Sequence, residues 1–361
     1  MASSVTIKDV ATHAEVSVGT VSRVFNNHSN VTDEIRQRVL KAASELGYYG
    51  RSTPDNTART PGRALKEIGF LYYSNLDLSI DGNVGVNPFW SHILHGAENE
   101  ARKANMKMTY RTIGDVSHSP QLLLSLIYDM KLGGILLVGP TEPEMIKVIQ
   151  TAKLPLVLVD NYVPRLSVDA VLCDNFEGAR QAVEYLIQAG HRQIAFIGGP
   201  TVEGGPRPIN KVYTIERRAS GYRTALLDAG IPVRYELYES GDLTAEGGYN
   251  ACQRLLARDV TFSALFCAND ATAIGALKAL RDAGREVPED VSLIGFDDLD
   301  TALYLSPALT TVRVNKEALG STAVKNLLAR AADMDAVSVT SILEVELVER
   351  DSVRRLTGPE L

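Results

Sequence analysis

A run of small hydroxyl-bearing residues around a single arginine is the first place in this chain where side chains could do chemistry. Residues 17–26 read SVGTVSRVFN. An arginine can donate two hydrogen bonds to the edge of a guanine, a contact worth about 1–3 kcal/mol of discrimination between bases. Serine and threonine hydroxyls suit phosphate oxygens, which fix the register of a protein on a duplex. The residue types therefore fit recognition of DNA.

The apolar residues around this run predict three short helices. They recur at helical spacing in two sets, Ile7, Val10, Ala11 and Ala14, and then Val21, Val24 and Phe25. Ser17 can cap the second helix, and a third is expected from about Thr32 to Gly47. This is the pattern of a helix-turn-helix, whose second helix enters the major groove. The residues expected to face DNA are Ser17, Val18, Gly19, Thr20, Ser22, Arg23 and Asn26. Periodicity alone also allows a three-helix module that binds protein.

Composition bounds the class of protein. The chain has 361 residues, of which 45% are apolar and 22% charged, the ordinary balance of a globular protein. No apolar run approaches the ~20 residues of a membrane helix, and the start MASSVTIKD does not read as a secretory signal. A cytoplasmic location away from membranes is therefore expected. Cys173, Cys252 and Cys267 have no metal-ligand spacing, so reduced, buried thiols and no metal or cofactor are expected.

The charge is unevenly distributed. The net charge is −7, yet residues 1–66 hold nine Lys and Arg against six acids, which leaves +3 there and −10 in the remainder. One mildly basic module should hold DNA weakly. Two linked copies on a two-fold, pseudo-palindromic operator would multiply the affinity. The sequence therefore predicts a homodimer held together by the body of the chain.

From Ile68 onward, short apolar strands alternate with helices. Strands are expected at 68–73, 107–112, 133–139, 155–161, 194–199, 236–241, 264–270 and 291–298, and helices near 89–104, 120–131, 142–152, 175–189, 216–229, 246–258 and 271–283. This order predicts two similar α/β lobes with parallel sheets. Parallel sheets bind ligands beyond the C-terminal ends of their strands, so Asp160, Asn269 and Asp297 should meet in a shared cleft. Their carboxylate and amide groups suit a hydroxyl-rich ligand.

A family resemblance covers nearly the whole chain. The run VSVGTVSRVFNN, with TIKDVA before it and ELGY after it, closely resembles the DNA-binding headpiece of the lactose/galactose repressor family of bacterial transcriptional regulators. By this resemblance Thr6 joins the DNA-contacting residues. One departure is Glu15 at the joint between the helices, where the family usually has glycine; we expect a slightly altered turn there.

The same family resemblance extends to the core. ERRASGY, FCANDATAIGALKAL, VSLIGFDDLD and PALTTVRVN are similar to family signatures of a core like the periplasmic sugar-binding proteins. The resemblance implies that Arg218, Asn269 and Asp297 contact the effector, with Asp160 lining the pocket in some members. Phe89 or Trp90 could stack on an apolar sugar face or a base, or pack between the lobe and a partner. Leu243 stands where some members have an aromatic residue.

The linker departs from the family pattern. Residues 50–63, GRSTPDNTARTPGR, are rich in Pro, Gly, Ser and Thr, the composition of a domain boundary. In the family this segment becomes a hinge helix whose leucine enters the minor groove. Asn56 and Arg59 match the hinge pattern and are expected to contact DNA, but Pro61 stands at the expected leucine position. Modest DNA bending is the resulting hypothesis.

The sequence thus predicts a small all-α helix-turn-helix domain followed by a two-lobed α/β core of the periplasmic-binding-protein type. The expected parts are a headpiece (1–49), a hinge (50–65), an N-lobe (66–162 plus 314–339), a C-lobe (163–313 plus 340–352) and a tail (353–361). The expected function is a transcriptional repressor whose operator affinity is controlled by a small polar effector, a sugar. A transport-type sugar-binding protein would share the core but lack the headpiece. An enzyme is not expected, because no GxGxxG, Walker, GxSxG or HExxH motif occurs.

Overall fold

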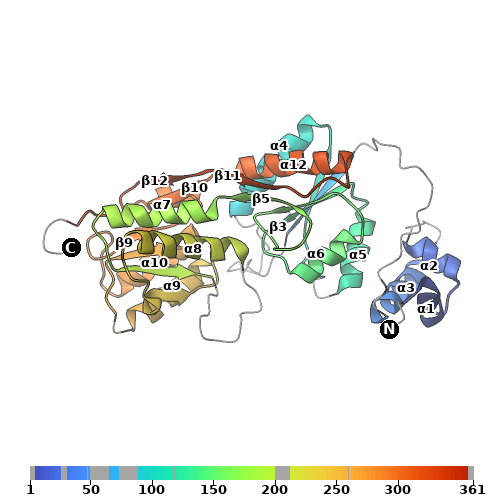
Figure 1. The fold of residues 1–361 in the computed structure, drawn as a ribbon, viewed down its shortest axis with the longest axis horizontal. Helices are drawn as coiled ribbons and strands as arrows, with labels where there is room; N and C mark the ends of the chain where they lie inside the picture. The colour runs from blue at the N-terminus through green and yellow to red at the C-terminus, as the bar shows by residue number, and fades with distance from the viewer. Residues whose placement is uncertain are drawn as a thin grey trace.

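The structure, a computed structural model, describes residues 5–25, 31–46, 48, 65–72, 88–114, 116, 119–199, 212–258 and 260–356. A small helical unit precedes a core of two lobes, each with a parallel sheet between helices (Figure 1). This confirms the predicted fold class. Asn26, Asn56, Arg59 and Pro61 lie outside the described residues, as does most of the predicted hinge.

The helical unit contains α1 (Ile7–His13), α2 (Val18–Phe25) and α3 (Asp33–Glu45). Its core is formed by buried side chains from all three helices, among them Val10, Val21 and Val39, each with no exposed surface. Between α1 and α2, Glu15 has φ 53°, the left-handed backbone conformation that glycine takes without strain. The chain therefore makes the turn of a helix-turn-helix with a residue that bears a side chain.

The first lobe is built on a six-stranded parallel sheet in the order β11-β5-β4-β3-β1-β2. The strands are β1 (Glu67–Tyr72), β2 (Lys107–Thr112), β3 (Gly134–Val138), β4 (Leu156–Val159), β5 (Asp169–Cys173) and β11 (Thr340–Leu343). One face packs on α4 (Pro88–Lys103) and α12 (Lys316–Ala332), and the other on α5 (Pro120–Asp129) and α6 (Pro143–Gln150). Alternate side chains of β1, β3, β4 and β5 supply the two cores.

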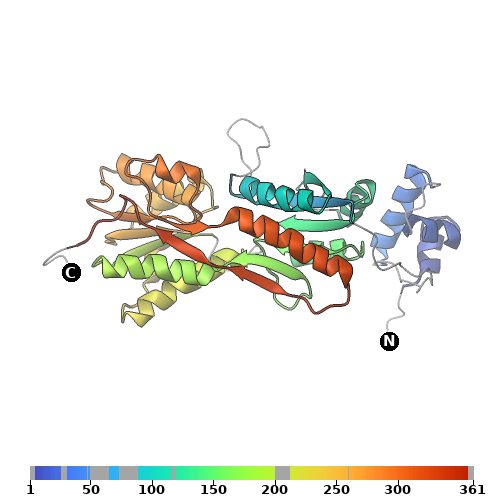
Figure 2. The same ribbon diagram turned by 90° about the horizontal axis from the view of Figure 1, so that it is seen from above.

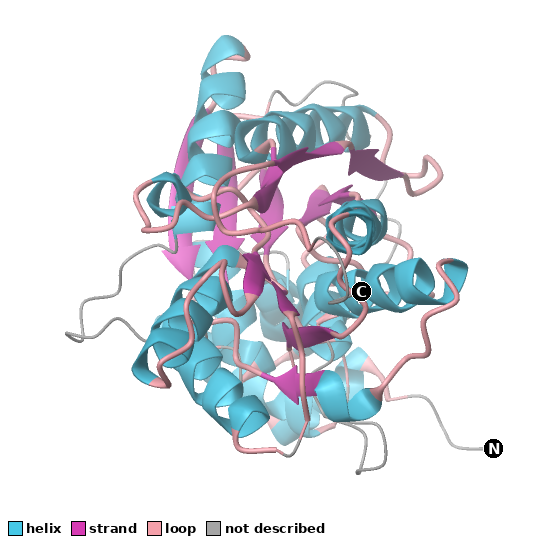
Figure 3. Ribbon diagram, turned by 90° about the vertical axis from the view of Figure 1, so that its left-hand side faces the viewer, coloured by secondary structure: helices cyan, strands magenta, loops and turns pink. Residues whose placement is uncertain are grey.

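The second lobe has a four-stranded parallel sheet in the order β7-β6-β8-β9. The strands are β6 (Ile194–Gly198), β7 (Tyr238–Ser240), β8 (Ala264–Cys267) and β9 (Ser292–Ile294). Helices α7 (Asn175–Gln188) and α8 (Tyr213–Asp228) cover one face, and α9 (Ala245–Leu256) and α10 (Asp270–Asp282) cover the other. Figure 3 looks at the molecule from the end that this lobe occupies and shows strands enclosed by helices. Two short helical segments, Tyr235–Leu237 and α11 (Asp300–Leu303), complete the lobe.

The chain passes between the lobes at three places. It passes from β5 into α7, from β10 (Thr311–Val314) into α12, and from β11 into β12 (Val345–Val348). Strands β10 and β12 pair antiparallel beside these passages, and Figure 2 shows the last strands running from one lobe to the other. The predicted lobe changes near 162 and 340 differ from this arrangement, because β5 and β11 still pair in the first sheet, Ala170 with Thr340.

Helix α4, the first helix of the core, packs tightly against α12, the helix that follows the passage of the chain from β10. Helices α4 and α12 pack through two glycines: a Cβ on Gly96 would lie 2.1 Å from the Glu317 carbonyl oxygen, and one on Gly320 would lie 2.0 Å from the Ile93 carbonyl oxygen. Only glycine permits backbones to approach so closely. The N-terminal end of α4, which faces the cleft, is thereby fixed to the crossing at residue 315.

Candidate functional site

A pocket of about 80 Å³ lies between the lobes and is lined from both sides. All six residues predicted to contact an effector line it: Phe89, Trp90, Asp160, Arg218, Asn269 and Asp297. Leu243 also lines it, as do residues that the sequence did not indicate: Pro140, Val212, Thr214, Ile215, Ala271 and Leu299. The structure thus brings the predicted set together at one place.

The two acids occupy equivalent positions in the two lobes. Asp160 follows β4 and Asp297 lies just beyond β9, and both have positive φ, 54° and 112°, where the chain reverses. Burial raises the pKa of Asp160 to about 7, although the nearby Arg218 charge opposes the rise and Asp297 adds to it. Burial likewise raises the pKa of Asp297 to about 6, against the opposing charges of Arg218 and Lys316. Each carboxyl is therefore poised to change charge near neutrality.

Arg218 projects from α8 and is held in place on every side. Its Nε donates to Asn175 Oδ1 over 2.8 Å, and its Nη1 donates to the Ala268 carbonyl oxygen. Its Nη2 lies 3.3 Å from Asp297 Oδ1, and its guanidinium stacks 3.7 Å from the centre of the Phe296 ring. An arginine restrained in this way is already positioned before any ligand binds.

Asn175 contacts the pocket arginine, a role that the sequence did not indicate. Its neighbour Asp174 caps α7, with its carboxylate accepting from the Glu177 amide. Asn175 instead binds Arg218 through its oxygen and donates from Nδ2 to the Cys173 carbonyl oxygen at the end of β5. It therefore ties the pocket arginine to the first crossing. No local pattern could distinguish the two neighbouring residues.

Asn269 has a double role. Its Oδ1 caps α10 by accepting from the Thr272 amide over 2.9 Å, and its Nδ2 donates to the Leu243 carbonyl oxygen over 2.9 Å. It lines the pocket while holding the loop before α9 against the start of α10. Part of its hydrogen-bonding capacity is thus committed within the protein.

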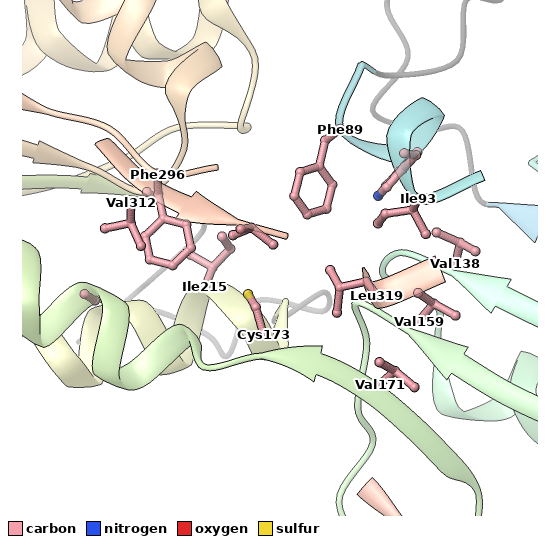
Figure 4. Close-up of a cluster of buried hydrophobic side chains, with 14 of the residues drawn as sticks. Phe89, Ile93, Val138, Val159, Val171, Cys173, Ile215, Phe296, Val312 and Leu319 are labelled. Atoms are coloured by element: carbon pink, nitrogen blue, oxygen red, sulfur yellow. The ribbon is translucent and has the colours of Figure 1, made fainter. Parts of the chain in front are cut away.

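The aromatic pair at the start of α4 forms the apolar wall of the pocket. Phe89 and Trp90 are both largely buried, and Trp90 lies 6.1 Å from the ring of Tyr72 and against Gly139. Figure 4 shows Phe89 between Ile215 and Phe296 of the second lobe and Ile93 of the first. The pair therefore packs within the first lobe and lines the pocket, while the two predicted roles, stacking on a ligand or packing against a partner, stay predictions.

The predicted DNA-facing residues lie on and around α2. Gly19 and Arg23 are exposed, Val18 is 41% exposed, and Ser22 is half-buried. Ser17 Oγ accepts from the Thr20 amide at 3.0 Å and thus caps α2, and the two hydroxyls also bond each other at 2.8 Å. Thr6 caps α1, with its amide and hydroxyl both donating to Asp9 Oδ2 at 2.7 Å. The Val18 and Arg23 side chains are open to a partner.

Two kinds of site find no support in the described ranges. Among those residues, no group of His, Cys, Asp or Glu side chains is arranged to hold a metal ion. Within the same residues, no helix combines the length and the apolar character that crossing a bilayer requires. A second cavity, of about 320 Å³, lies beside Tyr222 and Arg234 at the other end of the second lobe's sheet. It lacks the convergent acids of the cleft.

Comparison with known proteins agrees with this arrangement. Residues 6–50 match the description "Bacterial regulatory proteins, lacI family", and residues 183–353 match a periplasmic binding protein-like domain. The transcriptional repressor CytR of Escherichia coli K12 is 33% identical over 97% of both chains. A solved complex of the transcriptional regulator CelR with cellobiose has a TM-score of 0.72 and 30% identity, and covers 97% of this chain and 100% of its own.

A third similar protein extends the comparison to DNA. The structure of the lac repressor dimer bound to operator and an anti-inducer has a TM-score of 0.66 and 25% identity, and covers 98% of this chain and 100% of its own. These relatives are regulators rather than enzymes. A helix-turn-helix, a two-lobed core with an acid-lined cleft, and full-length similarity all agree: the chain is a DNA-binding transcriptional regulator that belongs to the lacI family of bacterial regulatory proteins.

Proposed function

We propose that this regulator is a cytoplasmic repressor whose operator affinity is set by a sugar bound between the lobes. The convergence of Asp160, Arg218 and Asp297 in one pocket, which aromatic residues also line, carries this proposal. Carboxylates and a guanidinium bind hydroxyls from fixed positions, and an aromatic face suits the apolar side of a sugar ring. A similar regulator was solved with cellobiose bound, which supports the same class of ligand here.

The route from pocket to DNA runs through a charged cluster at the crossings. Asp298, next to Asp297, accepts from Arg313 Nε over 2.7 Å and from Arg350, and Lys316 Nζ donates to the Asp297 carbonyl oxygen over 2.6 Å. Arg313 lies on β10 and Lys316 begins α12. The cluster therefore joins the loop that holds Asp297 and Asp298 to the passage of the chain from β10 into α12. A ligand that draws Asp297 toward Asp160 would therefore close one lobe on the other and rotate the chain at these points.

Closure would reach DNA through the distance between two headpieces. We propose a homodimer on a pseudo-palindromic operator, supported by the dimeric lac repressor bound to operator. In each headpiece Arg23 would read a base edge and Val18 a thymine methyl. Ser17, Thr20, Ser22 and the backbone at Gly19 would face phosphates, with Thr6 placed at the start of α1. Asn26, Asn56 and Arg59 are proposed as further DNA contacts on sequence grounds. A coupling free energy of about 1–3 kcal/mol between effector and operator is typical.

A titration of operator DNA with the full chain tests the proposal. The operator would be selected from random duplex DNA, and its affinity measured with and without each sugar that stabilises the chain. We expect at least about a fivefold change in affinity with one sugar, the lower end of ordinary coupling. A selection that returns no preferred DNA sequence would contradict the repressor function. Asp297→Ala should abolish the sugar's effect while operator binding persists.

A further inference from the structure

Two buried oxygens in the cleft have no hydrogen-bond donor within the described part of the protein. They are Asp160 Oδ1 and Asp297 Oδ1, and each belongs to a residue that lines the pocket. Asp297 Oδ1 lies 3.3 Å from Arg218 Nη2, an ion pair without hydrogen-bond geometry. Buried acceptors without a donor are rare because leaving them unbonded is costly. A ligand that supplies hydrogen-bond donors from both sides would satisfy them.

The positive charge of Arg218 is already neutralised by the carboxylate of Asp297. Arg218 gives one hydrogen bond to Asn175, another to a carbonyl oxygen and its charge to Asp297, while its face lies on Phe296. An anionic ligand would have to compete with Asp297 for this charge. It would also lie close to Asp160. Among the described lining residues no other side chain is basic. The nearby Lys316, outside the lining, already donates to the carbonyl oxygens of Asp297 and Asp298.

The rest of the described lining offers little to an anion. Phe89, Pro140, Ile215 and Leu299 are apolar, and the Asn269 amide already gives one hydrogen bond to the Leu243 carbonyl oxygen. With both acids ionised these lining residues carry one excess negative charge; with Asp160 protonated they are neutral. In neither state are they positive. Like charges brought together in such a site cost several kcal/mol.

We propose that the cleft selects an uncharged ring compound rich in hydroxyl groups, whose donors bridge Asp160 and Asp297, and that it rejects sugar acids and sugar or nucleoside phosphates. This inference rests on the effector role proposed above and narrows it by charge. A carboxylate or phosphate presents acceptors where the pocket also presents acceptors. A neutral hydroxyl presents a donor to each acid and can still accept from the remaining N–H groups of Arg218.

Matched pairs of ligands test the charge rule on the full-length chain. Each pair shares a carbon skeleton: D-glucose with D-glucuronate and D-glucose 6-phosphate, D-galactose with D-galacturonate, D-ribose with D-ribose 5-phosphate, and cytidine with cytidine monophosphate. Thermal shift at pH 8 would find stabilising compounds, and calorimetry would give their affinities. We expect a neutral compound to bind and its charged partner to bind at least about tenfold more weakly, since like charges repel. An acid or phosphate that binds better than its neutral partner would overturn the proposal, as would a panel with no neutral binder.

A pair of variants separates the pocket charge from the charge of the whole protein. Asp160→Asn keeps the shape, and asparagine tolerates the φ of 54° at this position. It should weaken binding of the neutral ligand. It should also reduce the difference in affinity between the neutral ligand and its acidic partner several-fold. Glu144→Gln removes an equal charge from an exposed side chain on α6 and should leave the gap unchanged. Equal effects of the two variants would overturn the proposal. Clear charge discrimination with no change in operator affinity would instead contradict the regulatory role alone.

Discussion

The carboxyl groups of the cleft give effector binding a pH dependence of known sign. Burial raises the pKa of Asp160 to about 7 and of Asp297 to about 6 in the unliganded protein. Ligand hydroxyls that donate to these oxygens favour the ionised form and lower both pKa values. Binding therefore releases protons below about pH 7, where the free carboxyls hold them. Arg218 and Lys316 face the pair and stay charged across this range. Asp270, which interacts with Asp297, has a pKa of about 8 and so titrates above it.

Effector affinity should accordingly rise from pH 5.5 to pH 7.5 and then level off. Calorimetry in two buffers of different ionisation enthalpy would measure both the affinity and the protons released. Asp160→Asn should flatten the upper part of the profile. An affinity that increases as the pH falls would mean that the ligand accepts hydrogen bonds from protonated acids, contrary to the donor geometry inferred here.

Arg23 is the residue on which sequence preference should depend. It is exposed on α2 and can donate two hydrogen bonds to one guanine. Arg23→Ala should reduce the binding free energy by about 1–3 kcal/mol on the selected operator and by much less on random DNA. Fluorescence anisotropy on both duplexes would give the two losses. Lys8→Ala, which removes an exposed charge from α1, is the matched control. It should weaken binding to both duplexes by the same factor.

Sequence reasoning reached residues whose roles have a local signature. Asp160 and Asp297 end apolar strands, and Arg23 follows the spacing of a helix face, so the positions of all three could be predicted. Asn175 could not, because its partners Arg218 and Cys173 meet it only in the folded chain. The use of Thr6 and Ser17 as helix caps was visible in part, since Ser17 has the residue type and position of a cap.

At the scale of elements, strand β10 is fastened to helix α10 by one buried carboxyl group. Asp270, the first residue of α10, accepts from Thr311 Oγ1 on β10 over 2.6 Å and from the Leu299 amide over 2.7 Å. Burial raises the pKa of Asp270 to about 8 with a further contribution from Asp297, while these two hydrogen bonds oppose the rise. The folded state thus keeps this proton to higher pH than the unfolded state, whose aspartate titrates near 4. The contribution of Asp270 to stability therefore falls between about pH 4 and pH 8.

Removing the Thr311 hydroxyl, which donates to Asp270, should make the loss of stability with rising pH steeper. Thr311→Val should lower the free energy of unfolding by about 1–3 kcal/mol, the cost of an unmet buried hydrogen bond. The loss should be larger at pH 8.5 than at pH 5, because the ionised carboxylate needs the donor more than the acid does. Urea unfolding at pH 5 and at pH 8.5 measures this loss of unfolding free energy. Thr301→Val, at an exposed position on α11, is the control. A loss that does not change with pH would show that packing, and not Asp270, accounts for the effect.

The elements that could be predicted are those with a clear period. The helices near 89–104, 120–131 and 175–189 were placed within two residues of α4, α5 and α7. Strand β5 was missed because the change of lobe was expected at the turn after Asp160, before it. Strand β11 is a four-residue edge strand whose exposed and half-buried residues alternate, and Ile342 is 61% exposed. Its place in the first sheet depends on pairing with β5, which no local pattern encodes.

For the whole molecule, the uneven charge sets how salt acts on the function. The +3 headpiece region and the −10 remainder act in opposite directions on DNA, so binding depends on short-range phosphate contacts. Each phosphate neutralised by a basic side chain contributes about −0.9 to the slope of log affinity against log salt. A dimer with several contacts per headpiece should therefore lose affinity steeply between 50 and 200 mM salt. A flat profile in the same anisotropy assay would contradict the DNA-binding role of α2.

The pairing of β11 with β5 has a consequence for how the protein is made. The first sheet needs Thr340–Leu343 beside Asp169–Cys173, yet the second lobe's sheet and its helices lie between them in the chain. At about 5–20 residues per second, the ribosome delivers the last strand roughly 10–30 s after its neighbour. During that interval the outer edge of β5 presents unpaired backbone groups, and the face that α12 covers stays open. The first lobe to emerge is thus among the last parts to be completed, and the nascent chain is most prone to aggregation while its second lobe is still being translated.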